Sequence, residues 1–557
     1  MKKTFLAALL ALSAPSAIVA QQHKIEYSTP FDEPESGWNK VMQLKNGNTF
    51  FFHFTKKKGI EVIVYDKNRK VISEQVITSN NWEPKKMSSS MIEGLYELGG
   101  QPVIFLHQLL DRTPTLFRIR LDANTGSVLE ENAISTLPRY KAGAAWAMAY
   151  GGVEAMDFYI EKDPVSDNYA VVNFNSFAHE SSERVEVIHY SAEGGGNHKV
   201  LNRAFYDAQG FKYLNFIGMS VDGSKRVFMC TYGYNTNGNG GKDSRVIISR
   251  LGKGEKEFTH KKLEFTDDFK DTKAVMEYNP GTNLIQLLTL TYTTSKNKFF
   301  SNKTTAYYMT LMSYVDPESL YIVATKPLMN EKVSSYAQSH FASNNQSYSG
   351  LPQQMVINND HSTTVLFEES DKEVVTNANT GQIVSAKTFL GSIGISELNE
   401  KGMEQDGYAI TKVQQANGLI DPLYISHKSK GHWSYRGGVG NPMIVNNNAF
   451  MSFDYVNANA NRYILFNDYT ENFHKGEDAK RKKVVVAISD ANTVCYKLNN
   501  GKLDKYFLFG APKEDNESKF CYIESSHFMK DNNTYATLMM DRKGRKKQAQ
   551  IAWVSFQ

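Results

Sequence analysis

The sequence predicts an all-β fold built from a four-stranded antiparallel unit that recurs along the chain. The first unit lies between Trp38 and Ile77, where four short segments of alternating apolar residues are separated by the turns KNGN, TKKKG and DKNRK. Gly, Asn and Asp favour such turns, because they tolerate positive φ or bond to their own backbone. One four-stranded meander cannot bury both of its faces, so the units must stack on one another. This repeat is typical of a β-propeller, and we expect seven or eight blades, with eight as the best count.

The recurrence of turn residues gives the approximate position of each blade. Comparable turns read DANTG, VDGS, NPGT, NEKG and NNG, and helical periodicity is scarce between them. The expected blades lie near residues 38–77, 93–133, 153–205, 213–265, 275–328, 354–414, 446–510 and 519–557. Two segments fall outside this pattern. We expect a short helix over Leu137–Gly151, whereas Gln415–Asn446 is too irregular to assign.

The last blade supplies only three strands, FCYIESS, TYATLMM and QAQIAWVSF, before Gln557. Residues 23–28, which read HKIEYS, could provide the fourth. We therefore expect Lys24–Tyr27 to pair as an outer strand with the strand at Ala549–Phe556. Closing the ring in this way removes exposed sheet edges, which are otherwise sites of aggregation.

The first residues have the pattern of a secretory signal peptide. Lys2 and Lys3 precede an apolar stretch from Phe5 to Leu12, and mostly small residues continue to Ala20 before a polar pair of glutamines. Residues 1–20 are therefore predicted to be removed, which leaves 21–557 as a single propeller domain. No later segment reaches the ~18 consecutive apolar residues of a membrane span. We expect an exported protein that stays in the periplasm or at the cell envelope, or is secreted.

Composition and charge exclude several classes of protein. Of the 557 residues 41% are hydrophobic, so the chain is neither disordered nor collagen-like. The charge is nearly balanced, with 63 Lys and Arg against 59 Asp and Glu. Basic clusters such as Arg542–Lys547 lack interleaved aromatic residues, so we expect no nucleic-acid partner.

The three cysteines are Cys230, Cys495 and Cys521, each in an apolar, strand-like setting. An odd number cannot pair completely within one chain. We expect three buried, unreactive thiols, because a free cysteine behaves as a small hydrophobic residue. A disulfide bond between Cys495 and Cys521 remains the alternative.

No local motif predicts a catalytic residue, a cofactor or a metal ion. The segment His179–Glu183 begins like a zinc-protease motif but has Glu where the second His belongs. The loop that ends at Lys242 lacks the first Gly of a phosphate-binding loop and the Ser or Thr that should follow the Lys. The 13 histidines are scattered singly, and a lone His is usually structural.

Three late segments carry a resemblance to known proteins. They are NANRYILFNDYTEN, KYFLFGAP and TYATLMMDRKGRKKQAQIAWVSF. These segments resemble the C-terminal part of large, uncharacterised, propeller-like exported proteins of Bacteroidetes-type bacteria. The resemblance covers about the last third of the chain and brings no catalytic residues. The Gly-rich sorting domain of many secreted proteins from such bacteria is not visible, which favours the periplasm or the periplasmic side of an outer-membrane assembly.

The distribution of loop lengths predicts which face of the ring carries function. In a meander the first-to-second and third-to-fourth turns lie on one side of the ring, and here they are short. The other side holds the long segments Asn80–Ser90, Leu137–Gly151, Ser176–Glu183, Gly233–Ser244, Ser295–Lys303, Glu331–Gly350, Gln415–Asn446 and Asp468–Lys482. Loops carry specificity on a rigid scaffold, so this long-loop face is the expected recognition surface. Unconstrained drift in loop length is the open alternative.

Aromatic and Arg side chains dominate binding hot spots, and those on the long-loop face are the predicted partner contacts. They are Trp82, Trp146, Phe299, Phe300, His432, Trp433, Tyr435, Arg436 and His474. The sequence thus predicts a non-catalytic propeller that binds an envelope protein or glycan. The alternative is a glycan lyase or hydrolase whose site is assembled from scattered loops on the same face. Two carboxylates facing one cavity would favour glycoside chemistry, whereas a flat aromatic face would favour binding.

Overall fold

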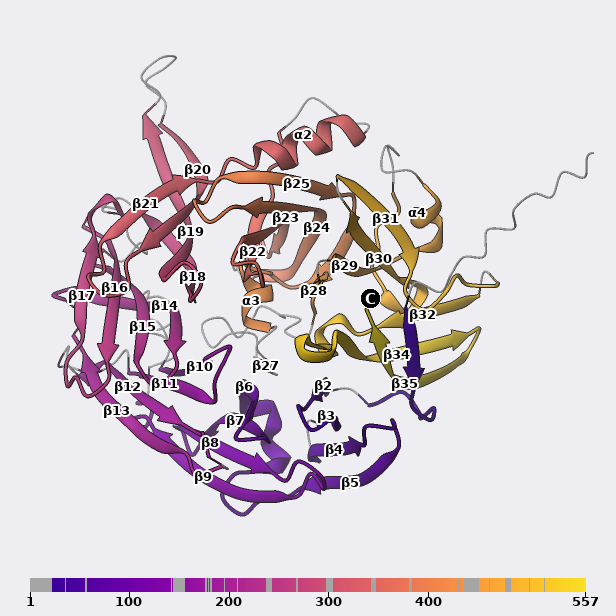
Figure 1. Cartoon of the computed structure of the whole chain (residues 1–557), viewed down its shortest axis with the longest axis horizontal. Helices are drawn as coiled ribbons and strands as arrows, with labels where there is room; N and C mark the ends of the chain where they lie inside the picture. The colour runs from indigo at the N-terminus through magenta and orange to yellow at the C-terminus, as the bar shows by residue number, and fades with distance from the viewer. Residues whose placement is uncertain are drawn as a thin grey trace, which may run out of the picture.

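The chain folds into a ring of β-sheets around a central axis (Figure 1). The computed structural model describes residues 23–556, with gaps at 36, 56–57, 142, 144–155, 176–177, 179, 181–182, 195, 208, 237–242, 267–268, 297–303, 342–346, 380–382, 429–430, 432, 435–449, 460, 476–481, 500 and 515. The predicted helix over Leu137–Gly151 lies largely outside the described residues.

Eight antiparallel sheets of four main strands make up the ring, which confirms the prediction of an eight-bladed propeller. Their first strands lie nearest the axis and their fourth strands at the rim (Figure 1). Blades I to IV consist of β2–β5 (Gly37–Gln43, Thr49–Thr55, Gly59–Tyr65, Val71–Ile77), β6–β9 (Ser90–Leu98, Gln101–Leu110, Thr113–Leu121, Val128–Thr136), β10–β13 (Asp157–Lys162, Asn168–Phe174, Val185–Ser191, Lys199–Tyr206) and β14–β17 (Tyr213–Asp222, Arg226–Tyr234, Arg245–Gly252, Thr259–Leu263).

The remaining blades follow the same order until the last. Blades V to VII consist of β18–β21 (Lys270–Asn279, Leu284–Lys296, Thr304–Val315, Ile322–Pro327), β22–β25 (Leu351–Ile357, Thr363–Thr376, Ile383–Leu398, Glu404–Ile410) and β28–β31 (Asp454–Ala458, Asn461–Asp468, Asn492–Asn499, Lys502–Phe507). Blade VIII consists of β32 (Glu517–Cys521), β34 (Thr534–Lys543), β35 (Lys546–Ser555) and β1 (Lys24–Tyr27), with the short β33 (His527–Met529) also paired to β34.

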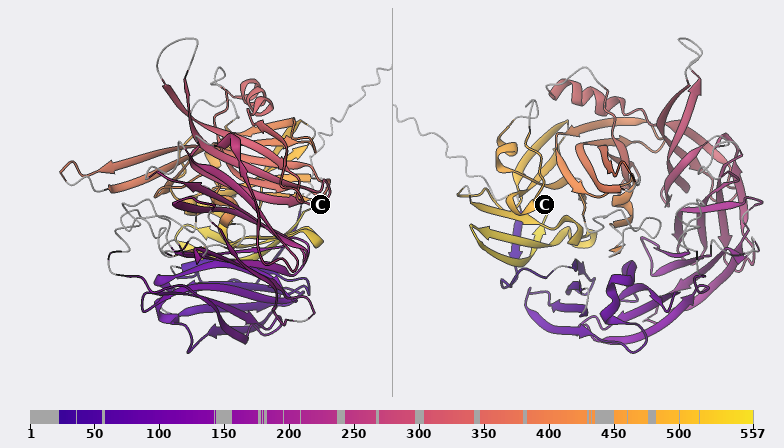
Figure 2. Two further views of the ribbon diagram at one scale, coloured as in Figure 1. Left: turned by 90° about the vertical axis from the view of Figure 1, so that its left-hand side faces the viewer. Right: turned by 180° about the vertical axis from the view of Figure 1, so that it is seen from behind.

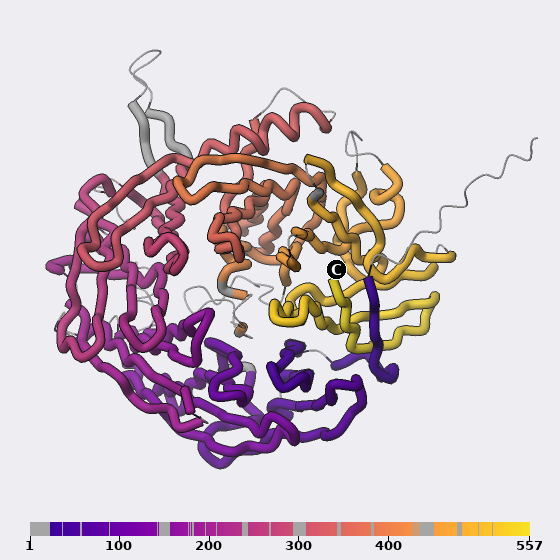
Figure 3. Tube along the Cα trace, viewed as in Figure 1, coloured from indigo at the N-terminus to yellow at the C-terminus, as the bar shows by residue number. Residues whose placement is uncertain are grey.

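Strands from both ends of the chain close the ring, as predicted. In the antiparallel pair β1–β35, Lys24 lies opposite Ser555 and Tyr27 opposite Ala552. Figure 3 shows the indigo β1 segment beside the yellow C-terminal blade. Closure joins blade VIII to blade I through the link between β1 and β2, so this link lies where the chain's first and last blades meet.

The hydrophobic core lies between adjacent blades. Strand β3 reads TFFFHFT and is buried at every position, because each of its faces packs against a neighbouring blade. Strands buried on both faces read as nearly continuous apolar runs, whereas the rim strand β5 is mostly exposed. Every blade therefore depends on both of its neighbours for burial.

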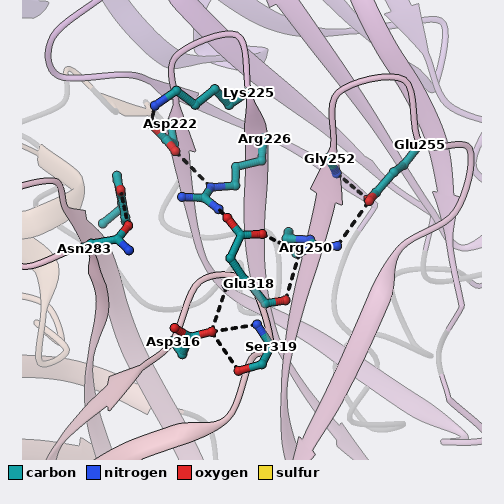
Figure 4. Close-up of polar contacts among 11 residues, drawn as sticks. Asp222, Lys225, Arg226, Arg250, Gly252, Glu255, Asn283, Asp316, Glu318 and Ser319 are labelled. Carbon is teal, nitrogen blue, oxygen red and sulfur yellow. Dashed lines mark hydrogen bonds and ion pairs between the residues drawn. The ribbon is translucent and has the colours of Figure 1, made fainter.

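Ion pairs add to this packing on the short-turn side of blades IV and V. Glu318, in the turn between β20 and β21, accepts hydrogen bonds from Arg226 and Arg250 of blade IV (Figure 4). The Arg250 Nη1–Glu318 Oε2 distance is 3.0 Å, and Arg226 also bonds Asp222 at 2.9 Å. Asp316 holds the turn by accepting the backbone N–H of Ser319 at 2.7 Å. One carboxylate thus joins two blades.

A long link between blades VI and VII crosses the axis of the ring. It carries β26 (Gln414–Asn417), α3 (Tyr424–Lys428) and β27 (Trp433–Ser434). Strand β27 pairs with β6 of blade II, and Figure 1 shows α3 and β27 inside the ring. This link, residues 411–453, is called the axial segment below.

Two further features depart from simple blades. The hairpin β23–β24 extends beyond blade VI and projects from one side of the ring (Figure 2). The segment predicted as the long loop Glu331–Gly350 contains a ten-residue helix, α2 (Glu331–His340), which buries Val333 and Ala337. Among the described residues, no helix is both long and apolar enough to cross a membrane.

All three cysteines are free and buried, so the Cys495–Cys521 bridge is absent. Cys230 lies in β15 with no exposed surface, as predicted. Burial raises the pKa of Cys230 well above its usual range and raises those of Cys495 and Cys521 to about 12. These thiols are therefore protonated at neutral pH and have little nucleophilic character.

Candidate functional site

A pocket of about 580 Å³ lies where blades VII, VIII and I meet. Its lining comes from inter-blade links, from the connection between β29 and β30 and from the inner edges of blades I and VIII. The lining residues are Glu33–Glu35, Gly37–Asn39, Gln414–Asn417, Phe450, Val485–Ser489, Tyr522 and Glu524. The short turns contribute none of them, so the pocket belongs to the long-loop face.

An interruption in the inner edge of blade VIII positions Tyr522 and Glu524. Strand β32 ends at Cys521, a 3₁₀ turn covers Ile523–Ser525, and β33 then resumes the pairing with β34. The Ser525 hydroxyl donates to the Tyr522 carbonyl at 2.7 Å, which stabilises the turn. The Tyr522 hydroxyl in turn donates to Glu33 Oε1 at 3.2 Å. A break in a strand thus aims two polar side chains into the pocket, a common use of irregular strands.

The pocket is acidic. Its lining includes Glu33, Glu35 and Glu524, and none of the described residues that line it is Lys, Arg or His. Lys547 lies 3.2 Å from Glu33 and Lys58 lies 3.5 Å from Glu35, at the exposed margin. Such pairs are screened by solvent and neutralise the carboxylates only in part.

Glu524 differs from the other two carboxylates, because burial raises its pKa to about 7. Beside it, burial lowers the pKa of Lys40 to about 8, and Lys40 Nζ donates to the carbonyls of Glu524 (3.1 Å) and Ser526 (2.6 Å). Burial also raises the pKa of Asp454 to about 6 and lowers that of Lys428, in α3, to about 8. Clusters of strongly shifted groups occur most often at functional sites.

The remaining lining supplies aromatic and amide groups. Trp38, Phe450 and Tyr522 are the aromatic members, and Gln414 is held by donating to the Asn467 carbonyl at 2.9 Å. Asn39 Oδ1 is buried and has no hydrogen-bond partner among the described residues. A buried acceptor without a donor costs free energy, so a bound group that donates a hydrogen bond would stabilise it.

A second pocket of about 470 Å³ lies on the other side of Pro34, which lines both. It is bordered by Asp32, Glu61 and Glu74, together with His53. The two pockets flank the link between β1 and β2, and carboxylates line both of them.

A separate polar cluster lies between blades II and III. His107 Nδ1 is 3.1 Å from Glu93 Oε1 and 3.3 Å from Asp157 Oδ1. Burial alone would lower the pKa of His107, but hydrogen bonds and charges from Asp157 and Glu93 outweigh it and raise the pKa to about 9. Burial and the nearby Glu93 charge raise the pKa of Asp157.

Two of the predicted contact residues are core residues instead, which corrects the sequence-based assignment. Trp82 is 2% exposed, and its Nε1 donates to Glu131 Oε2 at 3.1 Å. Trp433 is 4% exposed and stacks on Trp38. Their large apolar surfaces pack between blades I and II, so neither presents a face to a partner.

The other predicted contacts are exposed or lie outside the described residues. His474 ends α4 (Thr470–His474), is exposed, and contacts the ring of Phe473 edge-on. The remaining six, outside the described residues, are Trp146, Phe299, Phe300, His432, Tyr435 and Arg436.

Sequence reasoning missed the residues that line the pocket. Glu33 and Glu524 lie at opposite ends of the chain, and only ring closure brings them together. The one local signal was the polar IESS run inside an otherwise apolar strand segment. The Glu93–His107–Asp157 cluster was missed for the same reason, because three strands of two blades contribute to it.

Comparison with known proteins identifies no family. No family model matches the chain, and no curated protein matches it. Among solved structures, a prolyl endopeptidase is 10% identical with a TM-score of 0.37, covering 94% of this chain and 55% of that one. The polysaccharide lyase Uly1 is 10% identical with a TM-score of 0.36, covering 87% and 96%. A member of the DUF4221 family from Bacteroides vulgatus is 10% identical with a TM-score of 0.26, covering 55% and 88%.

The chain spans about half the length of the prolyl endopeptidase it matches. At these identities and TM-scores the likenesses say nothing about activity.

Proposed function

We propose that this protein is an exported, non-catalytic β-propeller that binds a glycan of the cell envelope in the pocket between blades VII, VIII and I. The observation that carries the proposal is the lining of this pocket, which combines three carboxylates, several amides and the partly exposed rings of Phe450 and Tyr522. Sugar hydroxyls donate to carboxylate and amide oxygens, while aromatic rings cover apolar sugar faces. A volume of about 580 Å³ lies within the usual range for small-ligand sites.

The negative charge of the pocket restricts the class of sugar that it can bind. Glu33 and Glu35 would repel uronic acids and sulfated sugars, because like charges in a partly buried site are costly. Neutral and amine-bearing sugars would be accepted. A hydroxyl or amine of the ligand would donate a hydrogen bond to the buried Asn39 Oδ1.

Calorimetric titration with neutral, amine-bearing and uronate-containing oligosaccharides tests this proposal. We expect neutral or amine-bearing members to bind, and the double variant Glu33→Gln/Glu35→Gln to weaken their binding at least tenfold. Glu514→Gln is a matched control, because this glutamate is exposed and lies outside the pocket. Binding of uronate-rich oligosaccharides alone, or equal effects of the pocket and control variants, would contradict the proposal.

One observation favours a glycan-active enzyme as the second candidate. With its pKa raised to about 7, Glu524 holds a proton for much of the time at neutral pH, as a general acid must. Glu33 or Glu35 would then be the second carboxylate of a hydrolase. Release of reducing ends from a bound oligosaccharide, lost in Glu524→Gln while binding is kept, would establish this alternative.

Export is part of the proposal and has its own test. Expression of the full chain in a Gram-negative host, followed by fractionation and N-terminal sequencing, should give a periplasmic protein that begins near Gln21. A cytoplasmic protein with an intact N-terminus would contradict it.

A further inference from the structure

We propose that Glu93, His107 and Asp157 form a binding site for a divalent transition-metal ion, separate from the glycan pocket. The three side chains offer one nitrogen and two carboxylate oxygens, and these ligand atoms all lie within 4.8 Å of one another. Imidazole with carboxylates suits ions such as Zn²⁺ and Co²⁺.

The backbone brings these ligands together from three strands. Glu93 lies in β6 at an irregularity in the pairing with β7, where the register shifts between Ile92 and Gly94. Such bulges re-aim a side chain, here toward His107 on the neighbouring strand. Asp157 is the first residue of β10, so it reaches the cluster from the next blade. The site therefore spans the boundary between blades II and III.

The distances match the edges of a coordination polyhedron. Metal–ligand bonds of about 2.0–2.1 Å separate neighbouring ligand atoms by about 3.0 Å in an octahedron and about 3.4 Å in a tetrahedron. His107 Nδ1 lies 3.1 Å from Glu93 Oε1 and 3.3 Å from Asp157 Oδ1. A metal ion between these atoms would need only small side-chain movements.

The ligands are held in place by their surroundings. The His107 ring meets the Phe158 ring edge-on, with centroids 4.9 Å apart. The Phe158 N–H donates to Asp157 Oδ1 at 2.8 Å. Contacts of this kind around the ligands fix their orientation and increase metal affinity.

Burial and charge favour a dication here. The side chains of Glu93 and His107 are 2% and 7% exposed, and that of Asp157 is 23% exposed. Two carboxylates in so small a buried space need positive charge nearby. A divalent ion balances both, whereas a protonated imidazole balances one.

Space for the remaining ligands adjoins the cluster. Glu93 also borders a cavity of about 60 Å³ lined by Tyr159, Glu161 and Ser426. This volume is enough for one or two water molecules, with Glu93, Glu161 and Ser426 as polar partners in a lining that is otherwise mostly apolar. Water from this cavity would complete the coordination of a three-ligand site.

The competing state is a charged His107 that is simply ion-paired to both carboxylates. Isothermal titration of the EDTA-treated mature chain with Zn²⁺, and absorption spectra with Co²⁺, distinguish the two. We expect one Zn²⁺ per chain and Co²⁺ bands in the visible region that indicate nitrogen and oxygen ligands.

His107→Gln should weaken Zn²⁺ binding at least tenfold, since it removes one of three ligands. His53→Gln is the matched control, because His53 is similarly buried but contacts one carboxylate, Glu61, at 2.8 Å. Asp157→Asn, at the most exposed ligand, serves as a second variant if His107→Gln fails to fold. Glu33→Gln/Glu35→Gln shows whether the ion binds in the acidic pocket instead.

Absence of Zn²⁺ binding at millimolar concentration would overturn the proposal. Equal losses in His107→Gln and His53→Gln, or loss only in the pocket variant, would overturn it as well. None of these results bears on sugar binding, so the metal site and the proposed function can fail independently.

Discussion

Trp38 of blade I and Trp433 of the axial segment stack with nearly parallel, offset rings, whose centroids lie 5.3 Å apart at an interplanar angle of 7°. Both rings are buried, at 3% and 4% exposure. Trp38 also lines the pocket, and Gln414 and Phe450, near the two ends of the axial segment, line it too. The segment that crosses the ring is thus attached to the wall of the candidate site.

This stacking gives the first prediction. Trp433→Ala should reduce the free energy of unfolding by about 3–5 kcal/mol, the usual cost of removing a buried Trp side chain. Met329→Ala is the control, because Met329 is 68% exposed. Urea denaturation followed by circular dichroism measures both. A Trp433→Ala protein as stable as the control would show that the axial segment does not brace the ring.

Ring closure gives the second prediction. Deleting residues 21–29 removes β1, exposes the edge of β35, and should lower the unfolding free energy by several kcal/mol. Differential scanning calorimetry of the mature and truncated chains measures the change. An unaltered melting temperature would mean that β1 is a peripheral strand and that closure contributes little.

The sequence predicted the architecture because turn chemistry and alternation are local. The turns VDGS and NPGT lie between the first two strands of blades IV and V, and HKIEYS closes the ring. Helix α2 was missed, although Val333, Tyr336 and Ala337 have the spacing of one helical face.

The residues of the candidate site could not be predicted from local sequence patterns. Glu33 and Tyr522 are hydrogen-bonded across the chain ends, and no spacing in the sequence indicates that contact. Trp433 was assigned to the long-loop face because the segment Gln415–Asn446 around it shows no regular strand or helix pattern. Its burial depends on Trp38, which only the folded ring brings against it.

The ion pairs between blades IV and V give the third prediction. Glu318→Gln should lower stability by about 0.5–1 kcal/mol at low salt, because Arg226 and Arg250 lose a shared carboxylate whose side chain is 68% exposed. The difference should vanish near 1 M salt, where the Debye length is about 3 Å. A loss that persists at high salt would indicate a packing role instead.

Cys230 gives the fourth prediction. It is fully buried and its pKa is raised by burial, so a thiol reagent should label it only at the rate of unfolding. Mass spectrometry of labelling in native buffer and in urea measures this. Rapid labelling of the native protein at Cys230 would show that β15 opens locally.

Glu524 gives the last prediction, which concerns pH. Burial raises its folded pKa from 4.5 to about 7, so between these values the folded state binds more protons at this site than the unfolded state. By linkage, this group lowers stability as the pH rises from about 4.5 to about 7, and the full cost remains above pH 7. The pKa of Lys40 is shifted in the opposite direction. It is lowered from 10.5 to about 8, so the cost of Lys40 to stability develops as the pH falls through this range and is complete below about pH 8. Glu524→Gln removes the first cost and leaves most of the second. Relative to wild type, the variant should therefore gain stability between pH 5 and pH 8, by up to about 2 kcal/mol after allowance for solvent screening.

Urea denaturation of both proteins at pH 5, 6, 7 and 8 measures the difference, with Glu514→Gln as the charge-matched control. A difference between wild type and Glu524→Gln that stays constant with pH would show that Glu524 titrates normally. That result would also remove the observation that favours a general acid in the pocket.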